Sequence, residues 1–312
     1  YDMLRQVDEP VPEVDEAFAK WVHSLRPLIT KEGDEIRNLI GAMKGVSILV
    51  HMCQSFKDDE VVDDCIVVLH DLCSSPVALE ELVVLGGLQV CVDILLDETR
   101  REWVHLHMLQ LLVRVVVTPD VKLSLMQLGA CPAIIRLVNH SDTSVVKRAL
   151  TLLSQCSTEE QNVEYYQSLG AAMIEPLLLL CENDFDITVL GLATGLLDKL
   201  VGTDAQKEIF VRLNAVSALL RVVSHSTDPR PKEHAMSVLR LLCMDPTIRR
   251  GIIDKGGLAP LVQATHYGET MEIRKHAGVV LAEISLSDAM APQLEMLEGG
   301  KVFSHLEKPK KR

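Results

Sequence analysis

The chain has 312 residues and a formal net charge of −13, and 48% of its residues are hydrophobic while only 4% are aromatic. An acidic surface repels phosphate backbones, so the charge argues against nucleic-acid binding. A core of Leu, Val, Ile, Ala, Met and Cys favours helices packed on helices over an aromatic-rich β-sandwich. No apolar run reaches the roughly 18 residues that a membrane-spanning helix needs.

The N-terminal segment differs in composition from the rest of the chain. Residues 1–20 hold six acidic residues together with Pro10 and Pro12, which predicts a flexible, solvated lead-in. Residues 21–40 predict helices that cap the N-terminal end of a repeat array beginning at residue 41. In this interpretation Trp21 covers the first repeat.

From residue 41 onward the sequence repeats itself. A glycine or another small or polar residue between two apolar segments recurs at intervals of 42, 43, 41, 44, 42 and 43 residues. We call these positions the junctions, and they are Lys44, Gly86, Gly129, Gly170, Asn214, Gly256 and Gly299. Self-similarity at a period of roughly 20–50 residues is the signature of repeat proteins.

Each repeat has the same internal plan of three helices. A short helix precedes the junction, a second follows it, and a longer third helix comes after a polar loop rich in capping residues. First helices are predicted at 78–86, 121–129, 162–170, 206–214, 247–256 and 292–299. Second helices are predicted at 88–96, 132–140, 173–181, 215–223 and 258–265. Third helices are predicted at 61–74, 102–117, 144–157, 187–201, 232–244 and 271–285.

The stretch IIDKGGLAPLVQAT (252–265), continued by GETMEIRKHAGVVLAEIS (268–285), resembles the armadillo family. The shared pattern is an apolar first helix, Gly-Gly, an apolar-Pro-Leu second helix and an Ala-x-x-x-Leu-x-x-Leu third helix. The resemblance covers roughly residues 40–306. It is loosest at 170–200, where Pro176 falls late in the second helix, and Gly191 and Gly195 interrupt the third.

The resemblance implies an all-α fold, a right-handed superhelix (α-solenoid) of about six three-helix repeats over residues 41–306. Neighbouring repeats in such an array bury their apolar faces against each other. The family's third helices line a concave groove. HEAT repeats, with two helices per unit, are the alternative architecture.

The glycine pairs do not predict phosphate binding. A phosphate-binding loop needs one glycine cluster after a strand, and a P-loop needs Gly-Lys-Ser/Thr. Here the pattern recurs in every repeat, so we interpret it as the turn between two helices. The acidic run Asp58–Asp64 is placed at the start of a third helix, where its charge opposes the helix dipole. With no nucleophile motif present, we expect no enzyme activity.

The eight cysteines and eleven histidines show no metal-binding pattern. There is no C-x-x-C pair, and residues two apart, such as His105 and His107 or His51 and Cys53, do not share a helix face. We therefore expect no metal, no other cofactor and no disulfide framework. Reduced buried thiols predict a cytoplasmic or nuclear protein.

The groove is the predicted binding site, although it lacks the peptide-binding side chains best known in the family. In importin-α-type proteins a Trp-x-x-x-Asn ladder on the third helices grips a basic peptide. The Trp positions here are Val67, Gln110, Thr151, Gly195, Ser237 and Val279, and the Asn positions are Asp71, Arg114, Gln155, Lys199, Leu241 and Glu283. One turn earlier lie Asp64, His107, Arg148, His234 and His276. Nor do these positions form the basic row of a β-catenin-like groove.

Twelve of these residues form the predicted partner-binding groove: Asp71, His107, Gln110, Arg114, Arg148, Thr151, Gln155, Lys199, His234, Ser237, His276 and Glu283. The tail 307–312 is basic, and it is either a nuclear localisation signal or a solubilising end. Its charged residues are Lys308, Lys310, Lys311 and Arg312.

The predicted function is that of a non-enzymatic scaffold or adaptor that binds a partner protein or helix in the groove. Fold analogy supports this prediction, together with the absence of catalytic motifs. The alternatives are a cochaperone clamp on an Hsp70- or myosin-type partner, a structural subunit of a cytoskeletal or axonemal assembly, and small-molecule sensing in the groove. A nuclear-import adaptor is least favoured because the ladder is missing.

Overall fold

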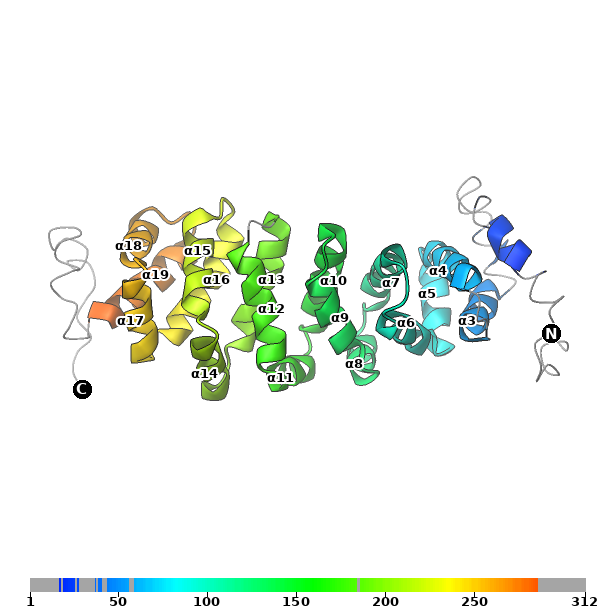
Figure 1. Ribbon diagram of the computed structural model, residues 1–312, viewed down its shortest axis with the longest axis horizontal. Coiled ribbons are helices and arrows are strands. Elements are labelled where there is room, and N and C mark those ends of the chain that lie inside the picture. The colour runs from blue at the N-terminus through cyan, green and yellow to red at the C-terminus, as the bar shows by residue number, and fades with distance from the viewer. Residues whose placement is uncertain are drawn as a thin grey trace. The chain divides into compact units, whose positions relative to one another are not determined.

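The structure is a computed structural model that describes residues 44–55, 59–183 and 186–285, with residues 17, 19–25, 27, 37, 39 and 40 before them. All regular secondary structure in this part of the chain is α-helical, as predicted (Figure 1). Most of the lead-in, the junction at Gly299 and the basic tail lie outside the described residues.

The chain divides into two compact units, which are described separately: unit 1 is residues 1–159 and unit 2 is residues 160–312. The boundary falls between the third helix of one repeat and the first helix of the next.

Unit 1 contains three second-and-third helix pairs with two first helices between them. In chain order these are α3 (Gly45–Ser55), α4 (Asp59–Leu72), α5 (Pro76–Val84), α6 (Gly87–Leu96), α7 (Glu102–Val115), α8 (Pro119–Gln127), α9 (Ala130–Val138) and α10 (Thr143–Cys156). Each third helix packs against the next one, α4 against α7 and α7 against α10. The second helices α3, α6 and α9 pack against one another in the same order.

Unit 2 repeats this arrangement with three complete triplets. They are α11 (Glu160–Ser168), α12 (Ala171–Glu182), α13 (Ile187–Leu200), α14 (Asp204–Arg212), α15 (Ala215–His225), α16 (Pro229–Leu242), α17 (Pro246–Asp254), α18 (Leu258–Tyr267) and α19 (Met271–Ser285). The third helices α13, α16 and α19 again pack in sequence. Three helices in each repeat match the armadillo plan and not the two-helix HEAT plan.

Every described junction residue has a positive φ, on the left-handed side of the range of backbone conformations. The glycines at Gly86, Gly129, Gly170 and Gly256 have φ between 57° and 84°. Lys44 (φ 58°) and Asn214 (φ 55°) are the non-glycine residues with positive φ in the described part of the chain, and both are junctions. A positive φ reverses the chain within one residue, so the interpretation of the junctions as turns is confirmed.

The residue after each junction is small because it packs against the preceding first helix. An added Cβ on Gly87 or Gly257 would lie 2.8 Å from the carbonyl oxygen of Leu82 or Ile252, respectively. Gly45 occupies the same place after Lys44, and alanine occupies it after the other three described junctions, at Ala130, Ala171 and Ala215. In the Gly-Gly pairs the first glycine thus adopts the positive φ of the turn, and the second lets the second helix pack closely against the first.

The number of residues from the start of a third helix to the next junction is constant. The third helices α4, α7, α10, α13 and α16 each begin 27 residues before the next junction. The distance from a junction to the third helix of the same repeat varies instead, from 14 residues after Gly129 to 17 after Gly170. All variation in repeat length therefore falls between the junction and the third helix.

Two local predictions need correction. The segment 225–231 was predicted as loop, but α16 begins at Pro229 and includes Pro231. Proline is tolerated in a first helical turn because those N–H groups have no intrahelical acceptor, and the Asp228 side chain caps this end by accepting from the Arg230 N–H (2.8 Å). Gly191 and Gly195 do not interrupt α13, which runs through both because packing overrides their low helix propensity.

The segment before the array also contains helical residues. Val22 and Leu25 are buried, while Trp21 is only partly buried. The capping role of this segment, and of Trp21 within it, stays a prediction. Among the described residues no single helix is long and apolar enough to cross a membrane; only α8 and α9 together reach that length, and they meet at 87°.

Candidate functional site

The third helices of each unit share one solvent-facing side, which we call the third-helix face. At 100° per residue, the second, fifth, sixth, ninth, twelfth and thirteenth residues of a helix fall on one side. The Trp and Asn positions of the sequence analysis are the ninth and thirteenth residues of each third helix, and the positions one turn earlier are the sixth residues. These offsets from the helix start are the same in all six third helices. The sequence alignment of the third helices is therefore confirmed.

All twelve predicted groove residues lie on this face, and none is fully buried. Unit 1 carries seven of them, on α4, α7 and α10, and unit 2 carries the other five, on α13, α16 and α19. Whether they bind a partner stays a prediction. The structure brings together the members within each unit, and the two sets are considered separately.

On α4 and α7 an aromatic and acidic cluster forms at this face. His107 stacks edge-on against Trp103 (ring centroids 5.8 Å apart) and against His70 (5.2 Å). The His70 Nδ1–H donates to Asp71 Oδ1 (3.2 Å). This hydrogen bond is the main cause that lowers the pKa of Asp71, and the positive charge of Arg37 acts in the same direction. Asp71 is therefore held as a carboxylate.

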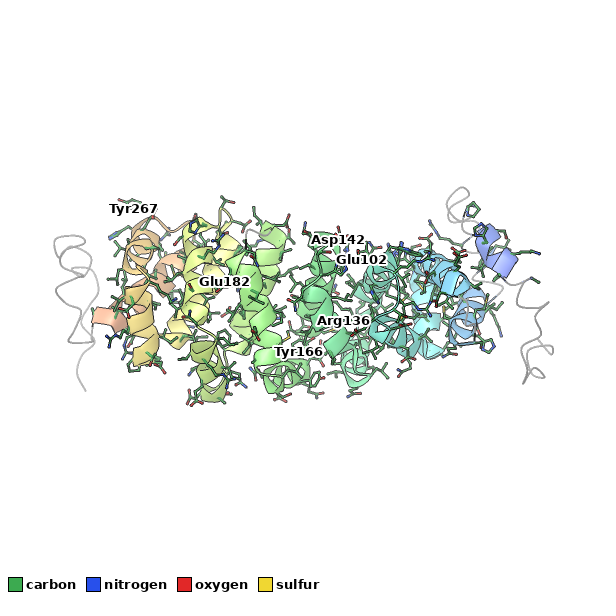
Figure 2. The ribbon with its side chains drawn as sticks, in the orientation of Figure 1. Glu102, Arg136, Asp142, Tyr166, Glu182 and Tyr267 are labelled. Atoms are coloured by element: carbon green, nitrogen blue, oxygen red, sulfur yellow. The ribbon has the colours of Figure 1, made fainter. Side chains whose placement is uncertain are left out.

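On α7 and α10 the face is basic and polar. Arg114 and Arg148 are exposed, and Lys147 is partly exposed beside them. One Nη1–H of Arg114 donates to the main-chain oxygen of His70 (3.2 Å), which holds one side of the guanidinium against α4. None of the six face positions of α7 or α10 holds a carboxylate. The neighbouring acid Asp142, labelled in Figure 2, is the N-cap of α10. Its side chain accepts a hydrogen bond from the Ser144 N–H (2.7 Å).

Gln155 adds an unused hydrogen-bonding group to this region. It occupies the thirteenth position of α10, which corresponds to the ladder asparagine of the importin-α type. Its Oε1 atom is shielded from solvent and accepts no hydrogen bond within the described residues. A shielded amide oxygen without a donor is unfavourable by roughly 1–3 kcal/mol.

In unit 2 the twelfth residue of one third helix meets the sixth residue of the next. Asp198 Oδ2 of α13 lies 3.1 Å from Nδ1 of His234 on α16. Arg240 of α16 occupies the corresponding place next to His276 of α19 but carries the opposite charge to Asp198: burial, and then the positive charge of Arg240, lowers the pKa of His276. His276 is therefore favoured in its neutral form, although it stands at the position equivalent to His234, which contacts a carboxylate.

Sequence reasoning missed four residues of these faces. Trp103 stands at a second position, and His70, Asp198 and Arg240 stand at twelfth positions. The same helical periodicity would have included them, because the second and twelfth residues lie four and three positions from the predicted sixth and ninth, respectively, and therefore on the same side of the helix.

The acidic run at the start of α4 has a role beyond the helix dipole. Asp63 is 3% exposed. Its Oδ1 lies 3.5 Å from Nη1 of Arg100, which also reaches Asp59 (2.8 Å) and, through Nε, Asp97 (3.0 Å). Burial raises the pKa of Asp63, and the charge of Arg100 opposes this rise. Arg100, in the loop before α7, thus ties two successive repeats of unit 1 together.

His105 and the cysteines have structural environments. His105 is buried and its Nε2–H donates to the Asp97 main-chain oxygen (3.1 Å), so it points away from His107 on the same helix. No group of three or more potential metal ligands comes together in the described ranges. All eight cysteines are free.

We expect the buried thiols to be unreactive in the folded protein. Burial raises the pKa of most of them to about 12, and the thiolate is the reactive form; these are Cys73, Cys91, Cys131, Cys156 and Cys181. A thiol reagent at pH 8 should label the half-buried Cys53 first and the other seven only after denaturation. Rapid labelling of several thiols in the native protein would contradict this expectation.

Comparisons with known proteins agree on the architecture. No protein-family model matches the chain, and no curated protein matches it. Among solved structures, an engineered protein superposes with a TM-score of 0.63 at 20% identity, covering 98% of this chain and 73% of that one. A computationally designed armadillo repeat protein for modular peptide recognition gives 0.62 at 16% identity, covering 76% of this chain and 99% of that one.

A further designed armadillo repeat protein, solved in complex with the peptide (KR)4, gives a TM-score of 0.59 at 16% identity and covers 77% of this chain and 99% of its own. Identities this low establish the fold alone. Together with the three-helix repeats and the left-handed junctions, they show that this chain has the all-α armadillo-repeat fold.

Proposed function

We propose that this protein is a non-enzymatic adaptor, and that unit 1 binds a carboxylate-bearing segment of a partner protein across α7 and α10. One observation carries the proposal: the third-helix face of these two helices presents Arg114, Lys147 and Arg148 and no carboxylate, in a chain whose net charge is −13. A local reversal of the overall charge favours and orients an oppositely charged partner.

The uncharged residues of the same face support a peptide-like partner. Trp103 and His107 offer flat surfaces on which an apolar side chain can pack, and Gln110, Thr151 and Gln155 offer hydrogen-bonding groups. The designed armadillo protein solved with (KR)4 binds a basic peptide. On the α7–α10 face a basic peptide would meet like charge, so we expect the opposite preference here.

The thiols support a proposal for the cellular compartment. Free cysteines throughout the fold support a reducing environment, and we propose the cytoplasm, or the nucleus if the tail 307–312 acts as an import signal.

The test compares two labelled peptides, (Ser-Glu)5 and (Ser-Lys)5, by fluorescence polarisation at low salt. The acidic peptide should bind more tightly, and the double variant Arg114→Glu/Arg148→Glu should weaken that binding about tenfold, equivalent to about 1.4 kcal/mol. The matched control reverses two exposed arginines of unit 2, Arg212→Glu/Arg250→Glu, and should have little effect.

A second arm uses the natural partner. Protein captured from the native source by the wild-type chain should be lost with the Arg114→Glu/Arg148→Glu variant and retained with the control variant. If the partner is captured equally by both variants, the α7–α10 face is not its binding site. Equal binding of the two peptides by the wild-type protein would also overturn the proposal.

A further inference from the structure

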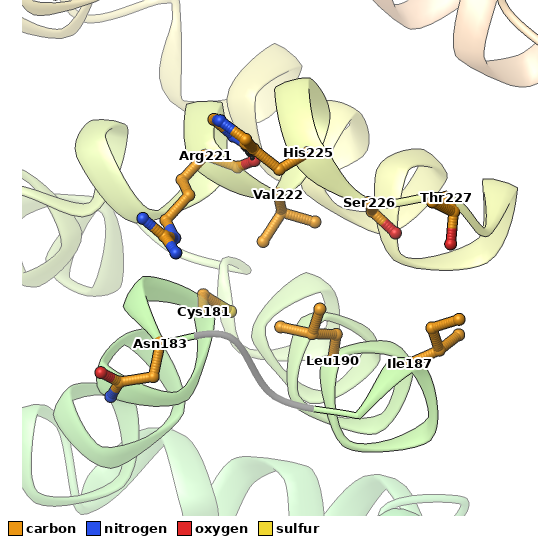
Figure 3. Close-up of a pocket in the computed structure, with 9 residues that line it drawn as sticks. All are labelled: Cys181, Asn183, Ile187, Leu190, Arg221, Val222, His225, Ser226 and Thr227. Atoms are coloured by element: carbon orange, nitrogen blue, oxygen red, sulfur yellow. Dashed lines mark hydrogen bonds between the residues drawn. The ribbon is translucent and has the colours of Figure 1, made fainter.

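A cleft of about 200 Å³ lies in unit 2, between the ends of α12 and α15 and the start of α13 (Figure 3). Its floor is apolar and is formed by Cys181, Leu190 and Val222. Ile187 extends this apolar surface to the rim, where it is 46% exposed. An isoleucine left half-exposed beside an apolar floor is a surface that an apolar side chain can cover.

One end of the cleft is polar and basic. Arg221 and Asn183 face each other at this end, and Ile187 and Thr227 lie at the opposite end (Figure 3). His225 stands beside Arg221, and its Nδ1–H donates to the Arg221 main-chain oxygen (3.1 Å). Because a carbonyl oxygen only accepts, this bond places the proton on Nδ1 and directs Nε2 away from the backbone.

The size of the cleft limits what it can hold. Sites for drug-sized ligands occupy roughly 300–1,000 Å³, so a cleft of about 200 Å³ holds a single amino-acid residue rather than a larger cofactor. Its basic end and apolar floor belong to the same small space, so a ligand that satisfies both must carry its carboxylate and its apolar side chain close together.

We propose that this cleft binds the C-terminal residue of a partner protein, with an apolar side chain such as leucine on the floor and the terminal carboxylate at Arg221. A C-terminal leucine bears both groups on one Cα atom, whereas an internal acidic residue next to a leucine places them on different residues. A guanidinium has five N–H donors in a fork that matches a carboxylate, so Arg221 can keep its present contacts and still receive one.

This site is independent of the function proposed for unit 1, because it uses no residue of the α7–α10 face. Its partner is also of different chemistry: a free chain end with an apolar last residue, rather than a segment rich in carboxylates. Either proposal can fail without the other.

The experiment titrates four short acetylated peptides and follows the methyl NMR signals of Ile187, Leu190 and Val222. Ac-Gly-Ser-Gly-Leu with a free C-terminus should shift these signals saturably. The same peptide with a C-terminal amide, and Ac-Gly-Ser-Gly-Gly with a free C-terminus, should each bind at least tenfold more weakly. Ac-Gly-Asp-Leu-Gly-amide tests the alternative of a side-chain carboxylate and should also be weak.

Variants locate the binding. Arg221→Gln should remove most of the advantage of the free acid over the amide, while Arg212→Gln, at an exposed arginine on α14, should leave it unchanged. Thr227→Trp, at an exposed rim position, should block the cleft and abolish all shifts without lowering Tm. Equal binding of acid and amide, stronger binding of the internal aspartate peptide, or no saturable shift at all would each overturn the proposal.

Discussion

Replacing Gly257 with valine should lower the free energy of unfolding of unit 2 by about 3 kcal/mol, the upper end of the usual range for overpacked sites. The Cβ of any side chain at Gly257 would lie 2.8 Å from the oxygen and Cγ2 of Ile252 and 2.8 Å from Cδ1 of Leu220. The first of these neighbours is main chain of α17, which cannot rotate away. The second helix would therefore have to move off the first.

The neighbouring glycine provides the matched control. Gly256 has φ +72° and nothing within 4 Å of an added Cβ, so its replacement is limited by backbone conformation and not by space. Gly256→Asn should cost little, because Asn214 occupies the equivalent junction with φ 55°. Gly256→Val should cost about 1–2 kcal/mol, the usual penalty of a left-handed conformation for a residue with a Cβ.

Thermal unfolding followed by circular dichroism measures the difference. At about 2–4 °C per kcal/mol for a domain of this size, Gly257→Val should lower Tm by about 10 °C and Gly256→Asn by no more than about 2 °C. The order of the two positions is the critical result. If substitutions at Gly256 are more damaging than the same substitutions at Gly257, the division of roles within the glycine pair is wrong.

Replacing Arg100 with methionine should destabilise unit 1 by about 3–5 kcal/mol at pH 7, the range found when one partner of a buried ion pair is removed. Asp63 is 3% exposed, and the Arg100 guanidinium is its nearest positive charge. Without it, the carboxylate would remain buried with only Arg101, 3.9 Å away and largely exposed, to offset its charge.

The loss should depend on pH in a direction set by Asp63. Burial raises the folded-state pKa of this carboxyl above its ordinary value of 3.8, so the folded protein binds this proton more readily than the unfolded chain. The resulting stabilisation is fully present below the unfolded pKa and is lost as pH rises through the folded pKa. Removing Arg100 raises the folded pKa further, so the penalty of Arg100→Met should shrink as the pH falls and Asp63 becomes neutral.

A double variant separates the buried charge from simple loss of packing. Asp63→Asn combined with Arg100→Met should recover much of the stability lost in Arg100→Met, because no unpaired charge is then buried. Urea unfolding at pH 7 and at pH 5 measures both effects. If the double variant is no more stable than Arg100→Met, and the loss is the same at both pH values, Asp63 is not the source of the penalty.

Much of the fold could be predicted from the sequence because the repeats specify it many times over. Equivalent residues at a period near 42 identified even Lys44 and Asn214 as junctions, although neither is glycine, and their backbone conformation confirms the assignment. Helical periodicity also identified the side of each third helix that faces solvent.

The features that the sequence did not predict are mainly contacts between elements distant in sequence. Arg100 meets Asp63 across two repeats, and the pairing of Asp198 with His234 joins two third helices. Neither pairing can be recognised from the local sequence. A charged residue is expected to be solvent-exposed unless packing is known to bring an opposite charge next to it. The start of α16 at Pro229 was missed for a different reason. Proline breaks a helix interior but is tolerated in a first turn, so in the sequence alone the prolines at 229 and 231 indicate a loop.

The constant 27-residue interval between the start of a third helix and the next junction bears on how this protein can diversify. From that start to the next turn the chain behaves as one block of fixed length, and residues are gained or lost between the turn and the following third helix, in the second helix as well as in the loop after it. Insertions there leave the alignment of the third-helix faces unchanged. The segment that lines much of the small cleft can therefore vary in evolution, or be re-engineered, without altering the third-helix face of α7 and α10.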